Sequence, residues 1–365
     1  MTLRFLARTP AGPVTAIASA VLFGASTPAA KLLMGHDVDP WMLAGLCYLG
    51  SGIGLASFRL LRRVFGQPIV EAPLRGGHLF RLIPVVLFGG VLGPLLLMIG
   101  LTQTTAATAS LLLNVEGLAT MVIAWVVFRE NVDGRLLVGA AALLAGAVVL
   151  SWQSGPGGIG PGSLAVVGAC IAWAIDNNLT RGLSDADPVQ IATIKGLFAG
   201  ATNFGLALAV GATLPSPTSI VAAGAVGFLG YGVSLVLFVL ALRHLGSART
   251  GAYFSTAPFI GALLAVVLLG EAPTVRLAIA AVLMGIGLHL HLTERHDHTH
   301  DHESLEHDHR HVHDEHHRHD HGPSDPPGEP HAHGHRHRSM THRHPHHPDL
   351  HHRHGHSRRG HDGGI

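Results

Sequence analysis

The sequence predicts an all-α polytopic membrane protein with about ten transmembrane helices, followed by a disordered histidine-rich tail. Hydrophobic residues make up 48% of the 365 residues and charged residues only 13%, whereas about a quarter of the residues in an ordinary soluble chain are charged. The first 292 residues are a succession of apolar stretches separated by short polar breaks, which is the pattern of a membrane domain. The composition therefore argues against a soluble fold for this part of the chain.

Each apolar stretch is long enough to cross a bilayer, because about 20 residues at 1.5 Å rise each span roughly 30 Å of hydrocarbon. The first stretch exceeds the apolar core of a signal peptide and has no small-residue cleavage pattern, so we expect a retained helix. The ten predicted spans are residues 13–33, 40–61, 80–101, 105–127, 135–152, 161–181, 188–211, 218–242, 246–269 and 273–292. Several are rich in Gly and Ala, which predicts close helix packing.

Positive charge is distributed unevenly between the polar breaks, and basic residues near helix ends favour the cytoplasmic side of the membrane. An N-terminus on that side leaves only Lys31 and Arg276 on the opposite face. An even number of spans then returns the C-terminal tail to the cytoplasm. The cytoplasmic set comprises Arg4, Arg8, Arg59, Arg62, Arg63, Arg75, Arg81, Arg129, Arg135, Arg181, Arg243, Arg249 and Arg295.

The chain also contains an internal repeat. A shift of 141 positions places Ala107 on Ala248, Glu130 on Glu271 and Gly146 on Gly287; a shift of 150 places Trp173 on Phe23, Asp176 on Ser26 and Arg181 on Lys31. Each half then holds five helices. An odd number per half forces the copies into opposite orientations, which is the inverted-repeat plan of secondary transporters.

Two segments carry a family resemblance: "TTAATASLLLNVEGLATMVIAWVVFREN" and "LGSARTGAYFSTAPFIGALLAVVLLGEAP". They resemble the paired EamA repeats of the drug/metabolite transporter superfamily, with Gly117 in the first copy where the second has Pro258. The resemblance implies two inverted five-helix repeats, residues 13–152 and 161–292, between a cytoplasmic N-terminus at 1–12 and the tail at 293–365. It also implies a bacterial inner-membrane carrier that exports or exchanges a small organic solute.

Charged residues inside the predicted spans mark a candidate site, because each costs at least about 2.5 to 3.5 kcal/mol on insertion scales. Glu116 lies near the middle of the fourth span, Asp176 in the sixth and Lys195 in the seventh. Asp176 and Lys195 are about five and seven residues from the inner ends of antiparallel helices, so they are predicted to pair. Such a pair is either a gate or coupling site or a structural ion pair that fixes two helices together.

The remaining candidates for substrate binding or coupling are polar or aromatic. Glu116 is a candidate for proton uptake. The amides equally fit interhelical hydrogen bonding, and the aromatic residues equally fit packing. Glu130 and Glu271 each precede an arginine by five residues, which favours a local salt bridge. The candidate set is Asn114, Glu116, Trp173, Asp176, Asn177, Asn178, Lys195, Asn203 and Tyr253.

The tail holds 25 of the 30 histidines, between His296 and His361. It has no apolar periodicity, so we expect disorder. Alternating histidine with aspartate and glutamate supplies imidazole and carboxylate ligands that suit zinc, nickel or cobalt, while a passive tail stays an equal alternative. The candidate metal ligands are His298, His300, His302, His307, His309, His311, His313, His316, His317, His319, His321, His333, His335 and His337.

The favoured function is a secondary carrier of amino acids, metabolites or drugs that works by alternating access. A divalent-metal exporter with the tail gathering metal is one alternative, and a membrane-anchored metal buffer or sensor is another. No phosphate-binding loop, nucleophile–base pair or cofactor fingerprint stands in the sequence, which argues against an enzyme or a required cofactor. Expected partners are a small solute and the lipid bilayer, with divalent metals and a homodimer left open and no nucleic acid.

Overall fold

The computed structural model describes residues 11–35, 38–66, 74, 79–128, 134–152, 159–180, 187–245 and 247–292, and in the tail residues 296–302, 306–311, 331–336 and 340–346. The chain divides into a helical unit, which ends at Thr293, and a unit formed mainly by residues 294–365.

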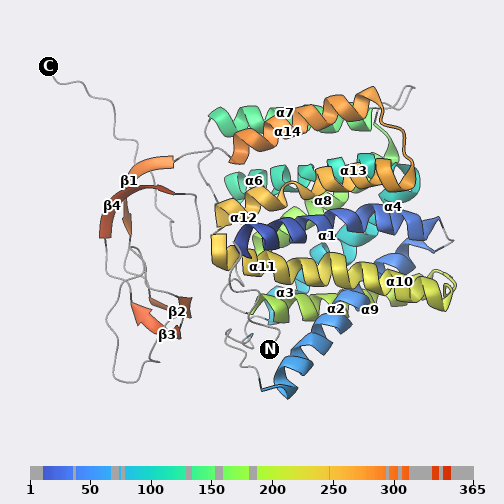
Figure 1. The fold of residues 1–365 in the computed structure, drawn as a ribbon, viewed down its shortest axis with the longest axis horizontal. Helices are drawn as coiled ribbons and strands as arrows, with labels where there is room; N and C mark the ends of the chain where they lie inside the picture. Colours follow the sequence, from blue (N-terminus) through green and yellow to red (C-terminus); the bar gives the residue numbers. More distant parts are fainter. Residues whose placement is uncertain are drawn as a thin grey trace. The chain divides into compact units, whose positions relative to one another are not determined.

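Ten helices of the described residues are long and apolar enough to span a membrane, which confirms the predicted fold class. Their bounds agree with the predicted spans to within three residues, except that the ninth starts at Thr250. The helical elements (Figure 1) are α1 (Ala11–Met34), α2 (Pro40–Val64), α3 (Leu79–Val85), η3 (Val86–Leu92), α4 (Gly93–Gln103), α5 (Ala106–Leu112), α6 (Asn114–Phe128), α7 (Gly134–Ser151), α8 (Pro161–Thr180), α9 (Pro188–Ala209), α10 (Pro217–Gly227), η5 (Phe228–Val233), α11 (Ser234–Leu245), α12 (Ser247–Phe254), α13 (Ala257–Leu269) and α14 (Val275–Leu292).

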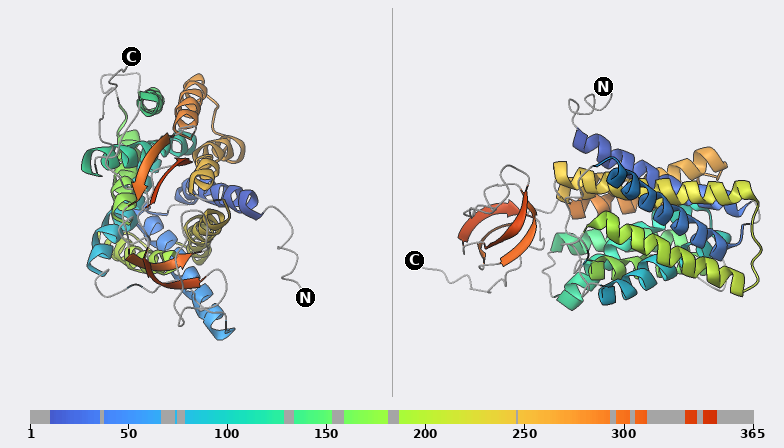
Figure 2. Two further views of the ribbon diagram at one scale, coloured as in Figure 1. Left: turned by 90° about the vertical axis from the view of Figure 1, so that its left-hand side faces the viewer. Right: turned by 90° about the horizontal axis from the view of Figure 1, so that it is seen from below.

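Helix packing relates the two halves of the chain, α1–α7 and α8–α14, by an approximate symmetry. The equivalent helices α2 and α9 pack on each other, as do α7 and α14. The α4–α8 contact has its counterpart in α1–α11, and the α6–α8 contact in α1–α13. Figures 1 and 2 show α1 lying among helices of the second half. The halves therefore interleave, and most extensive contacts join one half to the other.

Small residues make this close approach possible. A side chain at Gly227 would overlap the backbone of Cys47, and a side chain at Gly52 would lie 2.5 Å from the amide nitrogen of Leu197. Lipid offers no hydrophobic drive for helix association, so such backbone contacts supply the packing energy. The Gly- and Ala-rich composition of the spans is explained by these crossings.

Both halves contain a π-helical turn at the same place in the repeat. η3 interrupts the third span and η5 the eighth, and a shift of 141 places Gly89 on Gly230 and Gly93 on Ser234. A π-helical turn displaces backbone hydrogen bonds by one residue and is frequent at functional sites. The fourth and ninth spans are also interrupted at nearly matching positions, at Leu113 and at Ser255–Thr256, since a shift of 141 places Leu113 on Phe254. The breaks match although only the second copy carries Pro258.

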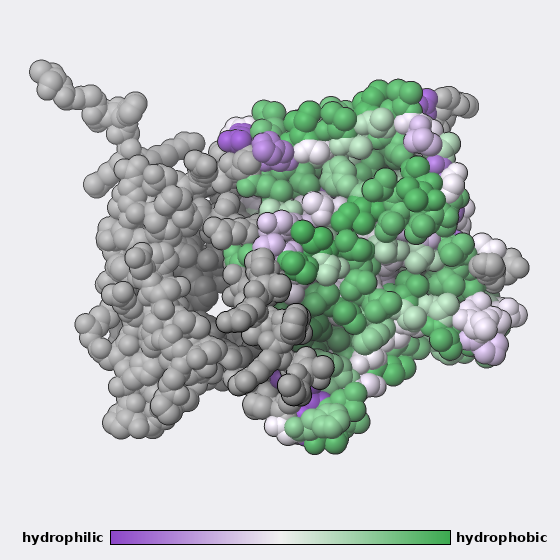
Figure 3. All heavy atoms as spheres, viewed as in Figure 1, coloured by the Kyte–Doolittle hydropathy of each residue, from purple (hydrophilic) through white to green (hydrophobic). Residues whose placement is uncertain are grey.

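Apolar side chains cover the outside of the helical unit, as the flank in Figure 3 shows. So many exposed leucine, valine and isoleucine side chains would be unusual on a soluble monomer. They suit contact with lipid. Exposed examples come from helices of both halves: Val14, Ile53, Val126, Val138, Val221, Leu263, Val267 and Val282.

The tail contains four short strands, which pair as two antiparallel ladders: β1 (His296–His302) with β4 (Met340–His346), and β2 (Glu306–His311) with β3 (His331–Arg336). A disordered tail was predicted, and an isolated two-stranded ladder with no apolar face is at best marginally stable in water. Each ladder therefore has fewer than the three strands that independent stability requires.

Candidate functional site between the two halves

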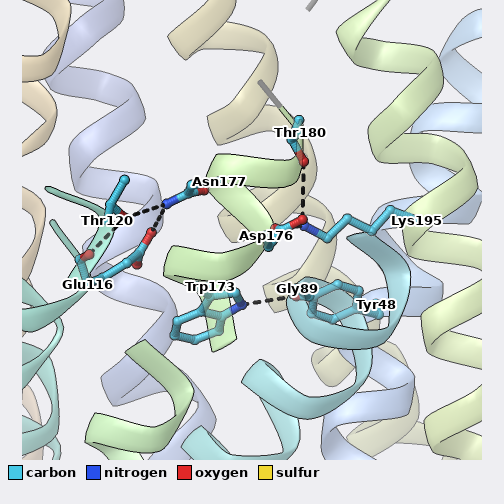
Figure 4. Close-up of polar contacts among 9 residues, drawn as sticks. All are labelled: Tyr48, Gly89, Glu116, Thr120, Trp173, Asp176, Asn177, Thr180 and Lys195. Carbon is cyan, nitrogen blue, oxygen red and sulfur yellow. Dashed lines mark hydrogen bonds and ion pairs between the residues drawn. The ribbon is translucent and has the colours of Figure 1, made fainter. Parts of the chain in front are cut away.

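The charged residues predicted inside the spans lie where α8 meets η3 and α6, and where α9 packs against η3 (Figure 4). Helix α8 belongs to the second half, whereas η3 and α6 belong to the first. Asp176 is buried, while Glu116 and Lys195 are half-buried. The site is therefore assembled from both halves of the repeat.

Asp176 and Lys195 form an ion pair between Oδ2 and Nζ, which confirms the pairing predicted from their depths. Thr180, one turn further along α8, donates from Oγ1 to Asp176 Oδ1 at 3.2 Å. Both carboxylate oxygens of Asp176 thus have a partner. The side chains are 7% and 19% exposed for Asp176 and Lys195, so the pair is shielded from solvent and strongly coupled.

Gly89 in η3 explains how this pair is accommodated. A side chain at this position would overlap the Asp176 carboxylate and the Lys195 ammonium group. The Gly93 amide donates to Phe88 in the π-helical turn, and Pro94, the next partner along the chain, has no N–H to offer. The Gly89 carbonyl is therefore released from the helix.

Two aromatic residues use this released carbonyl. Tyr48 donates its hydroxyl to Gly89 O at 2.8 Å, and Trp173 donates its indole N–H to the same oxygen at 3.0 Å. Figure 4 shows both side chains directed at Gly89 from opposite sides. Trp173 was a predicted candidate, and Tyr48 was missed. The signal in the sequence that could have located the acceptor is Pro94, five residues after Gly89.

Glu116 forms a second polar group with α8. Asn177 Nδ2 donates to Glu116 Oε1 at 2.9 Å and approaches Thr120 Oγ1 at 3.4 Å. Asn178 donates to the backbone oxygens of Thr120, at 3.3 Å, and Ala174, at 2.8 Å. In the described part of the chain, Asn177 is the side chain that contacts the Glu116 carboxylate. Glu116 therefore has no cationic partner there comparable to Lys195.

Three predicted residues occupy other surroundings. Asn203 is fully buried in α9 and donates to Gly90 O at 3.1 Å, while its Oδ1 has no partner among the described residues. Asn114 donates to Leu111 O at the break between α5 and α6 and lies 3.9 Å from Met284 Sδ. Tyr253 lies in α12, half-buried, and its carbonyl accepts from Thr256. Asn203 adjoins the site; the described contacts do not bring Asn114 or Tyr253 into it.

The symmetry-related position, where α1 meets η5, is aromatic instead of charged. Phe23 and Ser26 take the places of Trp173 and Asp176, and a side chain at Gly230 would lie 2.6 Å from Ser26 Cβ. Phe23 packs on Tyr231 with ring centroids 6.2 Å apart, and Tyr231 lies 5.5 Å from the Tyr48 ring. Tyr48 therefore joins a polar side of the site to an aromatic side.

The described residues contain no group of three or more His, Cys, Asp or Glu side chains placed to hold a metal ion. Of the predicted tail ligands, eight fall on described strands: His298, His300, His302, His307, His309, His311, His333 and His335. The other six lie outside the described residues: His313, His316, His317, His319, His321 and His337.

Comparison with known proteins agrees with this architecture. The family model for the EamA-like transporter family matches residues 10–152 and 160–293, one match for each half. The chain belongs to the EamA-like transporter family. It is therefore a multi-pass membrane transporter of the drug/metabolite type rather than an enzyme.

Relatives of this EamA-like chain carry transporter names. An uncharacterized transporter of Methanothermobacter thermautotrophicus is 26% identical over 287 residues, covering 75% of this chain and 83% of the relative. The uncharacterized inner membrane transporter YedA of Escherichia coli K12 is 26% identical over 245 residues, covering 64% and 74%. A solved crystal structure shares the fold with a TM-score of 0.55 and 22% identity, covering 76% of this chain and 94% of that one.

Proposed function

We propose that this transporter is a secondary carrier that exports or exchanges small organic solutes, such as amino acids, metabolites or drugs, by alternating access. The observation that carries the proposal is the charged site shared by the two halves: Asn177 of α8 contacts Glu116 on one side of the helix, and Asp176 of α8 pairs with Lys195 on the other (Figure 4). Rocking of one bundle of helices against the other would expose such a site to each side in turn. We propose with it that both termini face the cytoplasm, which reporter fusions at each end would test.

The carboxylate of Glu116 is the group in the site most suited to bind a partner that comes and goes during transport. Asp176 is balanced by Lys195, whereas Glu116 is half-buried and accepts one amide hydrogen bond. A carboxylate inside a membrane span is expensive unless it is paired or protonated. A proton, or a polar group of the solute, would supply the missing partner during transport.

Replacing Glu116 by Gln is expected to lower transport at least about tenfold, the size of effect that loss of one charged hydrogen bond produces. Glutamine keeps the size of the side chain and an oxygen for Asn177, so the fold is retained. The measurement compares the solutes accumulated and excreted by cells that express the wild type, Glu116→Gln or an empty vector.

Gly117→Ala is the matched control, because a side chain there meets no atom within 4 Å. It is expected to transport like the wild type. A solute whose export depends on the wild-type protein but is unchanged in Glu116→Gln would contradict the assigned role of Glu116. If no organic solute responds to the wild-type protein, the proposed substrate class is wrong.

We also propose that the tail binds zinc, nickel or cobalt. Along the two ladders the register places histidine opposite histidine six times, as in His298 with His344 and His309 with His333. Residues directly opposite in an antiparallel pair have Cβ atoms about 4.5–5.5 Å apart on one face. Imidazole nitrogens at such spacing suit these borderline metals.

The full chain is expected to bind several equivalents of zinc at pH 7.5, and the chain cut after Glu294 to bind at least about tenfold less. Binding is expected to weaken below about pH 6, because imidazole must be neutral to ligate a metal and its pKa is near 6.5. Equilibrium dialysis of both proteins in detergent measures this. Equal binding by the two proteins would contradict a metal site in the tail. Zinc, nickel and cobalt contents of cells expressing each form would show whether metal is also exported.

A further inference from the structure

The connection between α4 and α5 is held by charged side chains from two distant parts of the helical unit. Helix α4 ends at Gln103 and α5 begins at Ala106, so only Thr104 and Thr105 separate the two. The end of a helix exposes unpaired carbonyls and its start exposes unpaired amides. This short connection therefore presents a negative and a positive helix end next to each other.

Lys31, near the end of α1, contacts the negative end. Its Nζ donates to the carbonyl oxygens of Leu101 and Thr104, the latter at 3.0 Å. An ammonium group is the appropriate charge for the last turn of α4. The sequence marks Lys31 only as one of two basic residues on its face, with Arg276, and as the counterpart of Arg181 in the repeat. The structure shows that it caps a helix 70 residues further along the chain.

Glu271, which follows α13 in the second half, contacts the positive end. Its two carboxylate oxygens accept from the amides of Ala106 and Ala107 at 2.7 and 2.8 Å. The sequence suggests a local salt bridge with Arg276, whereas in the structure the Glu271 carboxylate accepts hydrogen bonds from the first turn of α5. The bond joins residues 165 positions apart and links the two halves.

The helix held in this way is short and is followed by a break. Helix α5 has only seven residues and ends at the break at Leu113, beyond which α6 begins. Its residues are buried from Ala106 to Leu112 except for one, and it packs against α13 and α1. The carbonyl of Leu112, at the far end of α5, lies 3.5 Å from the buried thiol of Cys170 in α8.

We propose that Lys31 and Glu271 form a latch at the end of the bundle where α1 terminates. The latch keeps α5 closed over the inner part of the site. Release of either charge leaves orphaned backbone groups at one end of the α4–α5 connection and frees α5 to turn at Leu113. Opening of this latch admits solvent along α5 toward Cys170. The inference rests on the proposed alternating-access function, because a latch has a purpose only where that end must open.

The two native cysteines make the opening measurable. Cys47 and Cys170 are the chain's only cysteines, and both are buried. The full-length Cys47→Ala protein reports on Cys170 alone, and the Cys170→Ala protein reports on Cys47 alone. An impermeant maleimide is applied separately to intact cells and to inverted membrane vesicles. Neither measurement requires the transported solute to be known.

Lys31→Met and Glu271→Gln are each expected to accelerate labelling of Cys170 roughly tenfold, the effect of losing charged hydrogen bonds, from one side of the membrane only. Cys47 labelling is expected to stay slow, which distinguishes local opening from unfolding. Asp39→Asn, near the start of α2, is the matched control, because asparagine preserves the cap that Asp39 supplies to α2. Cys170 labelling unchanged within twofold in both variants would overturn the latch.

A charge swap separates this latch from an ordinary ion pair. If Lys31 and Glu271 stabilised the fold by pairing with each other, the double variant Lys31→Glu/Glu271→Lys would restore the wild-type labelling rate. The latch requires the opposite result, because the carbonyl end of α4 and the amide end of α5 keep their polarity. We expect the swapped protein to label at least as fast as either single variant. Restoration by the swap overturns the proposal, whereas a failed solute screen with accelerated labelling would overturn only the proposed substrate class.

Discussion

Replacing Lys195 by Met is expected to destabilise the helical unit by about 3–5 kcal/mol, because it leaves the buried Asp176 carboxylate without its counter-charge. Asp176 is 7% exposed and lies against the backbone of η3 at Gly89. Water therefore cannot replace the lost ammonium group without disturbing the helix. Thermal unfolding of the purified full chain in a fixed detergent, followed by near-ultraviolet circular dichroism, measures the change.

The double variant Asp176→Asn/Lys195→Met is expected to recover most of that stability, since replacing a whole buried pair by neutral groups is often neutral. This variant separates the two roles open to the pair. We expect a folded protein that does not transport, because the charges belong to the site. Wild-type transport by the folded double variant would show instead that the pair only fixes α8 to α9.

Gly89→Ala is expected to have the second-largest effect. An added methyl group would overlap the Asp176 carboxylate and the Lys195 ammonium group at once, and overpacking alone costs about 1–3 kcal/mol. The change would push η3 away from α8 and strain the hydrogen bonds that Tyr48 and Trp173 donate to the Gly89 carbonyl. We expect transport to be lost and the unfolding temperature to fall.

Two other glycines in the spans provide the comparison for Gly89. Gly117→Ala adds a methyl group with no atom within 4 Å, and at Gly168 the nearest contact is 3.4 Å, to the end of the Leu96 side chain. Both substitutions are expected to be neutral or slightly stabilising, because alanine favours a helix by about 1 kcal/mol over glycine. Equal loss of activity at all three positions would contradict a specific steric requirement at Gly89.

Features that depend on length, polarity and periodicity were predictable. The ten spans follow from the length of their apolar stretches, and the pairing of Asp176 with Lys195 follows from their depths in antiparallel helices. The repeat was visible because both halves keep the same spacing around Glu130 and Glu271. In each case the information lies in the order of residues along the chain, because a rise of 1.5 Å per residue converts a position in a helix into a depth in the membrane.

Contacts that cross between the halves were decided by the tertiary structure alone. No sequence pattern places Glu271 on the amides of Ala106 and Ala107, or the Tyr48 hydroxyl on Gly89 O. Apart from proline, which has no N–H, every residue carries the same backbone carbonyl and amide, so which of these groups are free depends mainly on where a helix ends or becomes π-helical. The sequence by itself determined the membrane fold, its inverted halves and the charges within the spans. The tertiary structure decided which backbone groups those charges and hydroxyls contact. These contacts depend on how the helices of the two halves rotate and cross, and residue spacing along the chain does not encode that geometry.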